Sequence, residues 1–254
     1  MDLDLKGRTA WVTGGSKGIG RACAERLATE GCEVLLISRT AADLEAAARA
    51  MTADTGTRVR TFPADLSKSE EVQRLWASEP APDFLVNNAG AIPSGSITDI
   101  DETRWREAWE LKVFGYINMC REAVSRMQAR GSGVVVNIIG AGGEKPRPEY
   151  AAGAGGNAAL MALTRALGAH SLAKGVRVVG VNPGLIRTER LERQLRIRAA
   201  SQFGDAERWR ELLDPRFPPG KPDHIAAMTA LLCSDLSANT TGTIITIDGG
   251  ACAR

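Results

Sequence analysis

A glycine-rich turn near the amino terminus holds the residues whose types and spacing best suit a chemical role. It runs Thr13-Gly14-Gly15-Ser16-Lys17-Gly18-Ile19-Gly20 and directly follows a short apolar run. Gly14 permits a tight turn, Gly18 lets a pyrophosphate approach the backbone, and Gly20 allows close packing of helix against strand. A helix that begins here offers free N–H groups and the positive end of its dipole to an anion. The spacing therefore predicts a dinucleotide site, with contacts from Gly14, Ser16, Lys17, Gly18, Ile19 and Gly20.

The end of the next apolar run indicates which dinucleotide would bind. An NAD site usually has Asp or Glu at this point, where it accepts hydrogen bonds from the ribose hydroxyls. This sequence has Ser38-Arg39 instead. The Arg39 guanidinium matches a 2′-phosphate, while Lys17 adds a second positive charge and Ser38 a hydroxyl. The sequence therefore favours NADP(H) over NAD(H), although both cations would also suit a solvated surface.

Apolar runs and amphipathic stretches alternate along the chain. Most of the runs are apolar on both faces, which is typical of parallel strands covered by helices. We expect seven strands, at residues 10–12, 33–37, 58–62, 84–86, 134–139, 176–181 and 243–247. We expect helices at residues 19–30, 101–129 and 149–174, and further helices opened by capping boxes at residues 40–43 and 67–70. The pattern predicts an α/β fold: one Rossmann domain over residues 1–254, with a doubly wound, seven-stranded parallel sheet and helices on both faces.

Residues 188–222 interrupt this rhythm with a polar, arginine-rich stretch. Connections of this length in compact domains are usually functional or mobile, so we expect one or two short helices that form a substrate lid. Arg190, Arg193 and Arg196 recur every third residue, near one helix face. Two interpretations stay open: a solvated face, or a site for an anionic substrate such as a carboxylate or an acyl-CoA phosphate.

Composition limits the classes of partner. Lys and Arg number 32 against 30 for Asp and Glu, and a net charge of +2 gives no argument for nucleic acid. Five widely spaced cysteines and two histidines offer no metal-ligand set, and we expect reduced thiols. No stretch approaches the roughly 20 apolar residues of a membrane span, and residues 1–4 are not part of a signal peptide pattern. The expected location is cytoplasmic.

Further motifs make the chain resemble the short-chain dehydrogenase/reductase family over nearly its whole length. Asp65-Leu66 resembles the pair that contacts adenine in that family. Asn87-Asn88-Ala89-Gly90 is similar to the motif after the fourth strand, and Asp248-Gly249-Gly250 to the carboxyl-terminal signature. Asn182-Pro183-Gly184, followed by Thr188, resembles the segment that holds the nicotinamide carboxamide.

This resemblance implies an oxidoreductase that acts on alcohols and ketones, commonly as a homotetramer or homodimer. It also implies further cofactor contacts on the motifs just named. These are Asp65, Leu66, Asn88, Ala89, Gly90, Pro183, Gly184, Ile186 and Thr188.

The sequence departs from the family where the chemistry is normally done. Family members use an Asn, a Ser that polarises the substrate oxygen, and a Tyr-x-x-x-Lys pair, whose lysine lowers the pKa of the tyrosine. Counting from Leu163-Thr164-Arg165-Ala166-Leu167 puts Gly153 at the Tyr position and Asn157 at the Lys position. Gly140 falls at the Ser position and Lys112 at the Asn position. The Asn and the Lys have thus exchanged places.

Tyr150 lies three residues before Gly153, about one helical turn away. Its phenol could reach the same cleft from a different angle, and an ammonium nearby at Lys112 would favour the phenolate. The plainer alternative is a packing residue with a satisfied hydroxyl. Gly153, Gly155 and Gly156 weaken the helix, which favours either tight packing at a subunit interface or room for a bulky substrate.

Three functions fit these residues. The leading hypothesis is NADP(H)-dependent hydride transfer, with Lys112 orienting cofactor or substrate oxygen, Tyr150 handling the proton and Asn157 hydrogen-bonding to cofactor or water. The first alternative is a lyase, isomerase or hydratase on the same fold that uses Lys112 as its charged group. The second is a nucleotide-binding subunit without catalysis.

Overall fold

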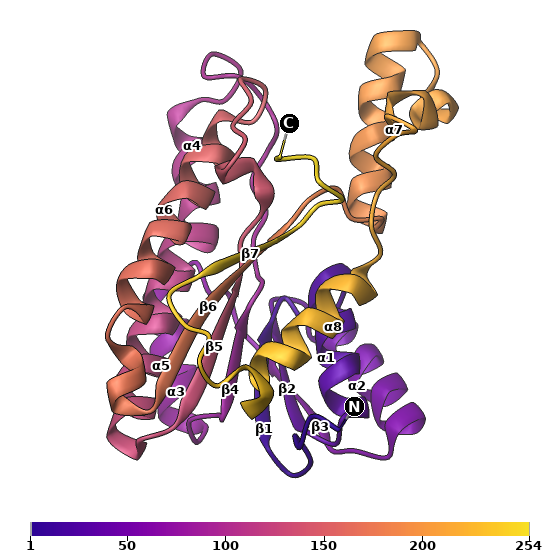
Figure 1. Ribbon diagram of the computed structural model, residues 1–254. Coiled ribbons are helices and arrows are strands. Elements are labelled where there is room, and N and C mark those ends of the chain that lie inside the picture. Colours follow the sequence, from indigo (N-terminus) through magenta and orange to yellow (C-terminus); the bar gives the residue numbers. More distant parts are fainter. Residues whose placement is uncertain (1, 254) are drawn as a thin grey trace.

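Seven parallel strands form one sheet in the computed structural model of the protein, which describes residues 2–253. The strand order is β3-β2-β1-β4-β5-β6-β7, so the direction of winding reverses between β1 and β4 (Figure 1). The strands are β1 (Thr9–Thr13), β2 (Glu33–Ser38), β3 (Val59–Pro63), β4 (Phe84–Asn87), β5 (Gly133–Ile138), β6 (Val176–Pro183) and β7 (Ile244–Ile247). The predicted doubly wound architecture is confirmed.

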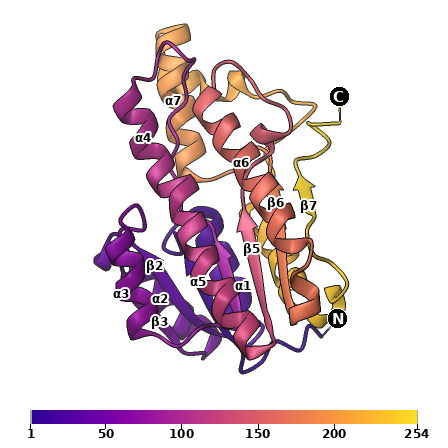
Figure 2. The ribbon, with the colours of Figure 1, turned by 90° about the vertical axis from the view of Figure 1, so that its left-hand side faces the viewer.

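Helices cover both faces of this sheet. On one side lie α1 (Gly18–Thr29), α2 (Ala41–Thr55) and α8 (Pro222–Cys233). On the other lie α3 (Ser69–Ser78), α4 (Glu102–Trp109), α5 (Gly115–Arg130) and α6 (Ala151–Gly168), as Figures 1 and 2 show. Neighbouring strand residues separate into two apolar clusters: Val86 and Val136 join one, Leu85 and Val135 the other. Strands buried on both faces explain the continuous apolar runs in the sequence.

Two of the expected long helices are interrupted. The pattern over residues 101–129 is split by a π-helical turn, Glu110–Phe114, which separates α4 from α5. The pattern over residues 149–174 gives α6 and then a separate 3₁₀ turn, Ser171–Lys174. A π turn inserts an extra residue into the helix and often marks a functional position, and Lys112 lies within this one.

Both expected capping boxes are wrong. Thr40 does precede α2, but its side chain makes no capping hydrogen bond. Ser67 lies two residues before α3, where its hydroxyl donates to the Asp65 carboxylate at 2.8 Å. A local side-chain bond has thus taken the hydroxyl that the capping pattern would have used.

Residues 188–222 contain a helix longer than expected, α7 (Glu189–Phe203), and a 3₁₀ segment, Ala206–Leu212. These two pack on each other around Leu195, Ala199 and Trp209. The two ends of this segment lie next to each other, because the Arg187 N–H donates to the Gly220 carbonyl oxygen at 2.8 Å. In Figure 1, α7 projects beyond the sheet, away from the chain's first residues. Within residues 2–253, no helix has the length and apolar character needed to cross a bilayer.

Candidate active site and cofactor site

The glycine turn has the backbone geometry that its sequence predicted. It joins β1 to α1, and Gly14 and Gly18 have φ values of 64° and 57°, which other residues rarely adopt. A Cβ atom on Gly20 would overlap Asn88 Nδ2 and the Gly14 carbonyl oxygen. Lys17, the residue before α1, makes no capping hydrogen bond, and the first turn of α1 has no acidic residue. The N–H groups there remain open to an anion.

Asn88 fixes this turn from the neighbouring strand. Its side-chain nitrogen donates to the carbonyl oxygens of Thr13, at 3.1 Å, and Gly14, at 3.3 Å. The Thr13 hydroxyl in return accepts from the backbone N–H groups of Asn88 and Ala89. The Asn-Asn-Ala-Gly motif therefore holds the turn in shape, because β1 and β4 are adjacent in the sheet.

Arg39 and Asp65, predicted to contact the adenosine end of a dinucleotide, line one cavity of ≈ 650 Å³. Ala91 and two arginines of α7, Arg190 and Arg193, line it as well. The hydroxyl oxygens of Ser16, in the glycine turn, and Ser38, at the end of β2, lie 3.3 Å apart. The Lys17 ammonium is 2.7 Å from the Asp43 carboxylate, so its charge is shared with α2.

Of the residues expected at the nicotinamide end, Thr188 lies near the glycine turn. A Cβ atom on Gly18 would lie 3.4 Å from Thr188 Cγ2, which places the start of α7 opposite the turn. Pro183 ends β6, and Gly184 packs so closely against Asp248 that a side chain there would clash. Ile186 is buried beside this segment.

Lys112 lies in a closed triangle of hydrogen bonds that the sequence did not predict. Its ammonium donates to Tyr116 Oη at 2.9 Å and to the Ile138 carbonyl oxygen at 2.8 Å, and Tyr116 Oη donates to the same carbonyl at 2.7 Å. The methylenes of Lys112 cross Gly90, where a Cβ atom would overlap them. Within residues 2–253 no hydrogen bond joins Lys112 to Tyr150.

Burial makes this lysine unusual. Lys112 is only 7% exposed, and its desolvation, aided by the positive charge of Arg190, lowers its pKa to about 7. The amine is therefore partly neutral near neutral pH. Tyr116 was missed in the sequence because an aromatic residue on a helix usually belongs to the core. Its spacing of four residues from Lys112 was the available signal.

The phenol ring of Tyr150 occupies the place of a side chain at residue 153. A Cβ atom on Gly153 would overlap Tyr150 Cζ, and one on Gly142 would lie 3.2 Å from Tyr150 Cδ1. Tyr150 precedes α6, and its hydroxyl makes no hydrogen bond with a residue that the structure describes. Burial raises the pKa of this phenol, and the charge of Arg190 opposes the rise. Gly153 thus makes room for the chain's own tyrosine.

The other two glycines of this helical turn, Gly155 and Gly156, are explained by a different neighbour. Added Cβ atoms would contact Trp109 of α4, at 3.4 Å from Gly155 and 3.5 Å from Gly156. Trp109 Nε1 also donates to the Ala152 carbonyl oxygen at 3.0 Å. Gly156 serves close packing within the chain, because an added Cβ atom there would also lie 3.2 Å from Val113 Cγ2, whereas a Cβ atom on Gly155 would make only an ordinary contact.

Asn157 fills the space beside Gly140, at the end of β5. A Cβ atom on Gly140 would lie 2.9 Å from Asn157 Nδ2, and one on Gly142 would lie 3.7 Å from it. Asn157 is 3% exposed, and its Oδ1 atom has no hydrogen-bond partner among the described residues. Gly142 therefore separates two polar side chains, Tyr150 and Asn157, that both lie within 4 Å of the same point.

Arg190 connects α7 to the loop after β4. Its guanidinium donates to the carbonyl oxygens of Gly90, at 2.8 Å, and Ile92, at 3.1 Å. Ile92 belongs to the apolar cluster on which Tyr150 packs. Arg196, by contrast, forms ion pairs with Glu192 and Glu207 inside the 188–222 insertion.

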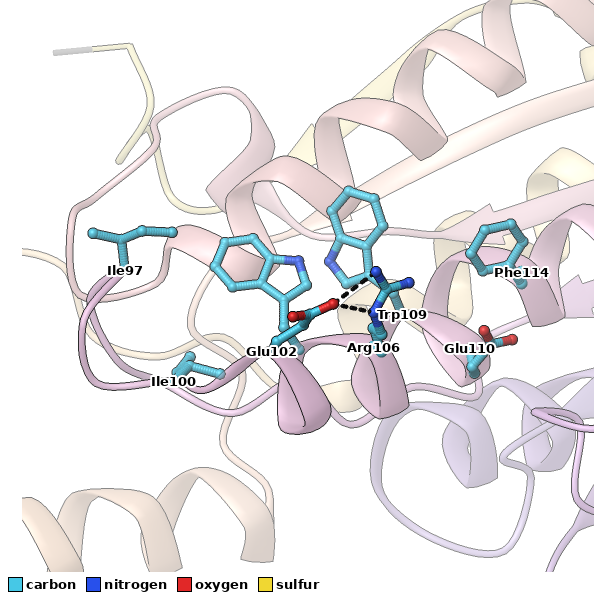
Figure 3. A pocket seen from close by; sticks show the side chains of 8 residues that line it. Ile97, Ile100, Glu102, Arg106, Trp109, Glu110 and Phe114 are labelled. Carbon is cyan, nitrogen blue, oxygen red and sulfur yellow. Dashed lines mark hydrogen bonds and ion pairs between the residues drawn. The ribbon is translucent and has the colours of Figure 1, made fainter.

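A second groove, of ≈ 520 Å³, lies on the outer side of α4 and the π turn (Figure 3). Trp105, Trp109 and Phe114 line it, and the Glu102–Arg106 ion pair borders it. Lys112, Tyr150 and Asn157 are not among its lining residues, so it is separate from the candidate active site.

A glycine turn at the carboxyl end of β1, next to the point where the strand order reverses, defines the class of dinucleotide-binding α/β domains. Comparison with known proteins narrows this class. Residues 14–252 match the family described as "Enoyl-(Acyl carrier protein) reductase". Galactitol 2-dehydrogenase (L-tagatose-forming) from Cereibacter sphaeroides is 32% identical over 251 residues, which cover 97% of this chain and 95% of that protein.

Solved structures are similar to this chain over its whole length. L-Sorbose reductase from Gluconobacter frateurii, complexed with NADPH and L-sorbose, has a TM-score of 0.91 and 29% identity, with 100% of both chains covered. A short chain dehydrogenase/reductase family protein has a TM-score of 0.87 and 35% identity, again over 100% of both chains. The chain belongs to the short-chain dehydrogenase/reductase family of oxidoreductases.

Proposed function

We propose that this protein is an NADP(H)-dependent oxidoreductase that interconverts a carbonyl compound and an alcohol through a rearranged active site. The observation that carries the proposal is the overlap of the Tyr150 ring with the side-chain position of Gly153. By the register inferred from the sequence, glycine stands at the family's tyrosine position, and the Tyr150 ring lies where the Cβ atom of that residue would be. An unpaired hydroxyl in that space suits a general acid and base.

The residues around the glycine turn fit the cofactor. The uncapped start of α1 suits a pyrophosphate, and the Arg39 guanidinium at the end of β2 suits a 2′-phosphate. The complex of L-sorbose reductase with NADPH supports the same choice, because that protein shares this fold over its whole length. When bound, the nicotinamide would supply or accept the hydride.

The chain's own residues would do the rest. Tyr150 would give the proton to the substrate oxygen in reduction and take it in oxidation. Lys112 would orient cofactor or substrate oxygen from the π turn, and Asn157 would hydrogen-bond in the pocket beside Gly140. Residues 188–222 would act as the substrate lid, with Arg190 holding its first turn against the loop after β4.

Further properties follow from family membership as proposals. We expect a cytoplasmic homotetramer or homodimer, which sedimentation velocity would test. An anionic group on the substrate would find the exposed Arg193 at the rim of the larger cavity.

Kinetic measurement on Tyr150→Phe tests the function. NADPH oxidation would be followed by the absorbance of the reduced nicotinamide against a panel of ketones, and NADPH affinity by its fluorescence. We expect kcat to fall about 100-fold or more, with little change in NADPH affinity. Full activity of Tyr150→Phe would refute the proton role. Tight NADPH binding by the wild type without turnover of any compound would favour a non-catalytic subunit instead.

A further inference from the structure

The side chain of Asn157 is buried without satisfying its hydrogen-bonding groups. Only 3% of the residue is exposed, and its amide oxygen is buried without a hydrogen-bond partner among the described residues. A buried polar group without a partner destabilises a fold, so such groups are rare outside functional sites. The amide therefore indicates a ligand that supplies both a hydrogen-bond acceptor and a donor.

Three glycines let the chain after β5 pass close to this amide. Gly140, Gly142 and Gly143 follow β5, and an added Cβ atom on any of them would come within 4 Å of the Asn157 side chain. The Tyr150 ring borders the same space across Gly142. A substrate bound beside Gly142 would therefore be close to both the Tyr150 ring and the Asn157 amide.

We propose that Asn157 selects α-hydroxy ketones, and vicinal diols in the reverse direction, as the substrates of this site. This inference rests on the proposed function. The amide N–H would donate to the reacting carbonyl oxygen, and the amide oxygen would accept from the neighbouring hydroxyl. The two oxygens of an α-hydroxy ketone are neighbours, as are the oxygen and nitrogen of an amide. If the amide oxygen and nitrogen exchanged positions, the same two hydrogen bonds would form, with the carbonyl and the hydroxyl of the substrate exchanged as well.

Binding can be measured apart from turnover by using the oxidised cofactor. In the protein–NADP⁺ complex, 3-hydroxy-3-methyl-2-butanone and 3-methyl-2-butanone form a matched pair that differs by one hydroxyl; neither ketone can be reduced, and the tertiary hydroxyl cannot be oxidised. We expect calorimetry to show about tenfold or more tighter binding of the hydroxy ketone to the wild type. Asn157→Leu, which keeps the shape but removes donor and acceptor, should bring the ratio of the two dissociation constants to about one.

The unliganded fold supplies a second readout with a matched control. Asn137 is also buried, but its amide bonds Asn87 and Thr164 at 3.0 Å each. Asn137→Leu should lower the melting temperature because it leaves those partners unpaired. Asn157→Leu should leave the melting temperature unchanged or raise it. A marked fall in Asn157→Leu would show that the amide is a structural group and would overturn the proposal.

The remaining outcomes separate this inference from the proposed function. Equal binding of the two ketones to the wild type, or no binding of either, would overturn the inference while leaving reduction of other carbonyl compounds open. Weaker NADP⁺ binding in Asn157→Leu with an unchanged ketone ratio would assign the amide to a cofactor hydroxyl, and would also overturn it. Selective binding of the hydroxy ketone without turnover by NADPH would support the inference and refute the reductase function.

Discussion

The buried ammonium of Lys112 should make the stability of this protein rise with pH. An unfolded lysine has a pKa near 10.4, whereas burial lowers the pKa of Lys112 to about 7. Between these values the unfolded state holds one more proton than the folded state, so the free energy of unfolding increases by about 1.4 kcal/mol per pH unit. Below about pH 7 both states are protonated and the gain is absent. Over the whole window the gain approaches about 5 kcal/mol.

Lys112→Met tests this linkage, because the variant keeps a long side chain and leaves Tyr116 bonded to the Ile138 carbonyl. Urea unfolding of both proteins from about pH 6.5 to about pH 8.5 gives the difference in stability at each pH. We expect the variant to be the more stable at the acid end, and its advantage to shrink by about 2 kcal/mol over that range.

Other groups oppose this trend, so the comparison between the two proteins is needed. Burial raises the pKa values of the Cys23 and Cys120 thiols to about 12. The unfolded thiols lose their protons first, so stability falls as the pH rises above about 8.5, equally in both proteins. Lys174→Met, which removes an exposed ammonium, controls for the loss of a charge. Parallel stability curves for the wild type and Lys112→Met would refute the argument that burial neutralises this lysine.

Three further substitutions follow from the same contacts. Gly153→Ala should push the phenol out of its place and lower kcat about tenfold or more without weakening NADPH binding; Gly155→Ala, which meets only one tryptophan carbon, should match the wild type. Thr164→Val leaves a donor of Asn137 unpaired and should cost about 1–3 kcal/mol in urea unfolding, and an unchanged midpoint would contradict that bond. Arg39→Asp should weaken binding of NADPH far more than of NADH in a fluorescence titration, and an equal loss for both would count against the 2′-phosphate site.

Much of the fold could be predicted because its signals are local and redundant. The central strands β4, β5 and β6 are buried on both faces and therefore appear as apolar runs, and the glycine turn needs backbone angles that few other residues adopt. Helix starts were less reliable. The pattern at Ser67 resembles a capping box, but the hydroxyl bonds Asp65, and only the three-dimensional turn decides between these partners.

The candidate site was likewise predictable only in part. The sequence indicated Lys112, Tyr150 and Asn157, but it did not predict how they are arranged. Whether Lys112 approaches Tyr150, which the sequence left open, depends on where a long, flexible side chain turns, and its ammonium bonds Tyr116 and a strand carbonyl instead. The overlap of the Tyr150 ring with the Gly153 position depends on the path of the chain before α6, which no periodicity encodes.

The place of Tyr150 just outside α6 has a dynamic consequence. A phenol within a helix is held by the hydrogen bonds of the turns on either side, whereas this one follows the charged connection of residues 143–149. The connection is tied to other parts of the chain by a backbone bond from Gly95 N to Glu149 O, at 2.8 Å, and by side-chain bonds from Thr246 to Glu144 and from Lys145 to the Ala251 carbonyl oxygen. The position of the proposed proton donor therefore depends on how well this connection is ordered. Substitutions in residues 144–149 would be expected to lower kcat by changing how often Tyr150 is in position.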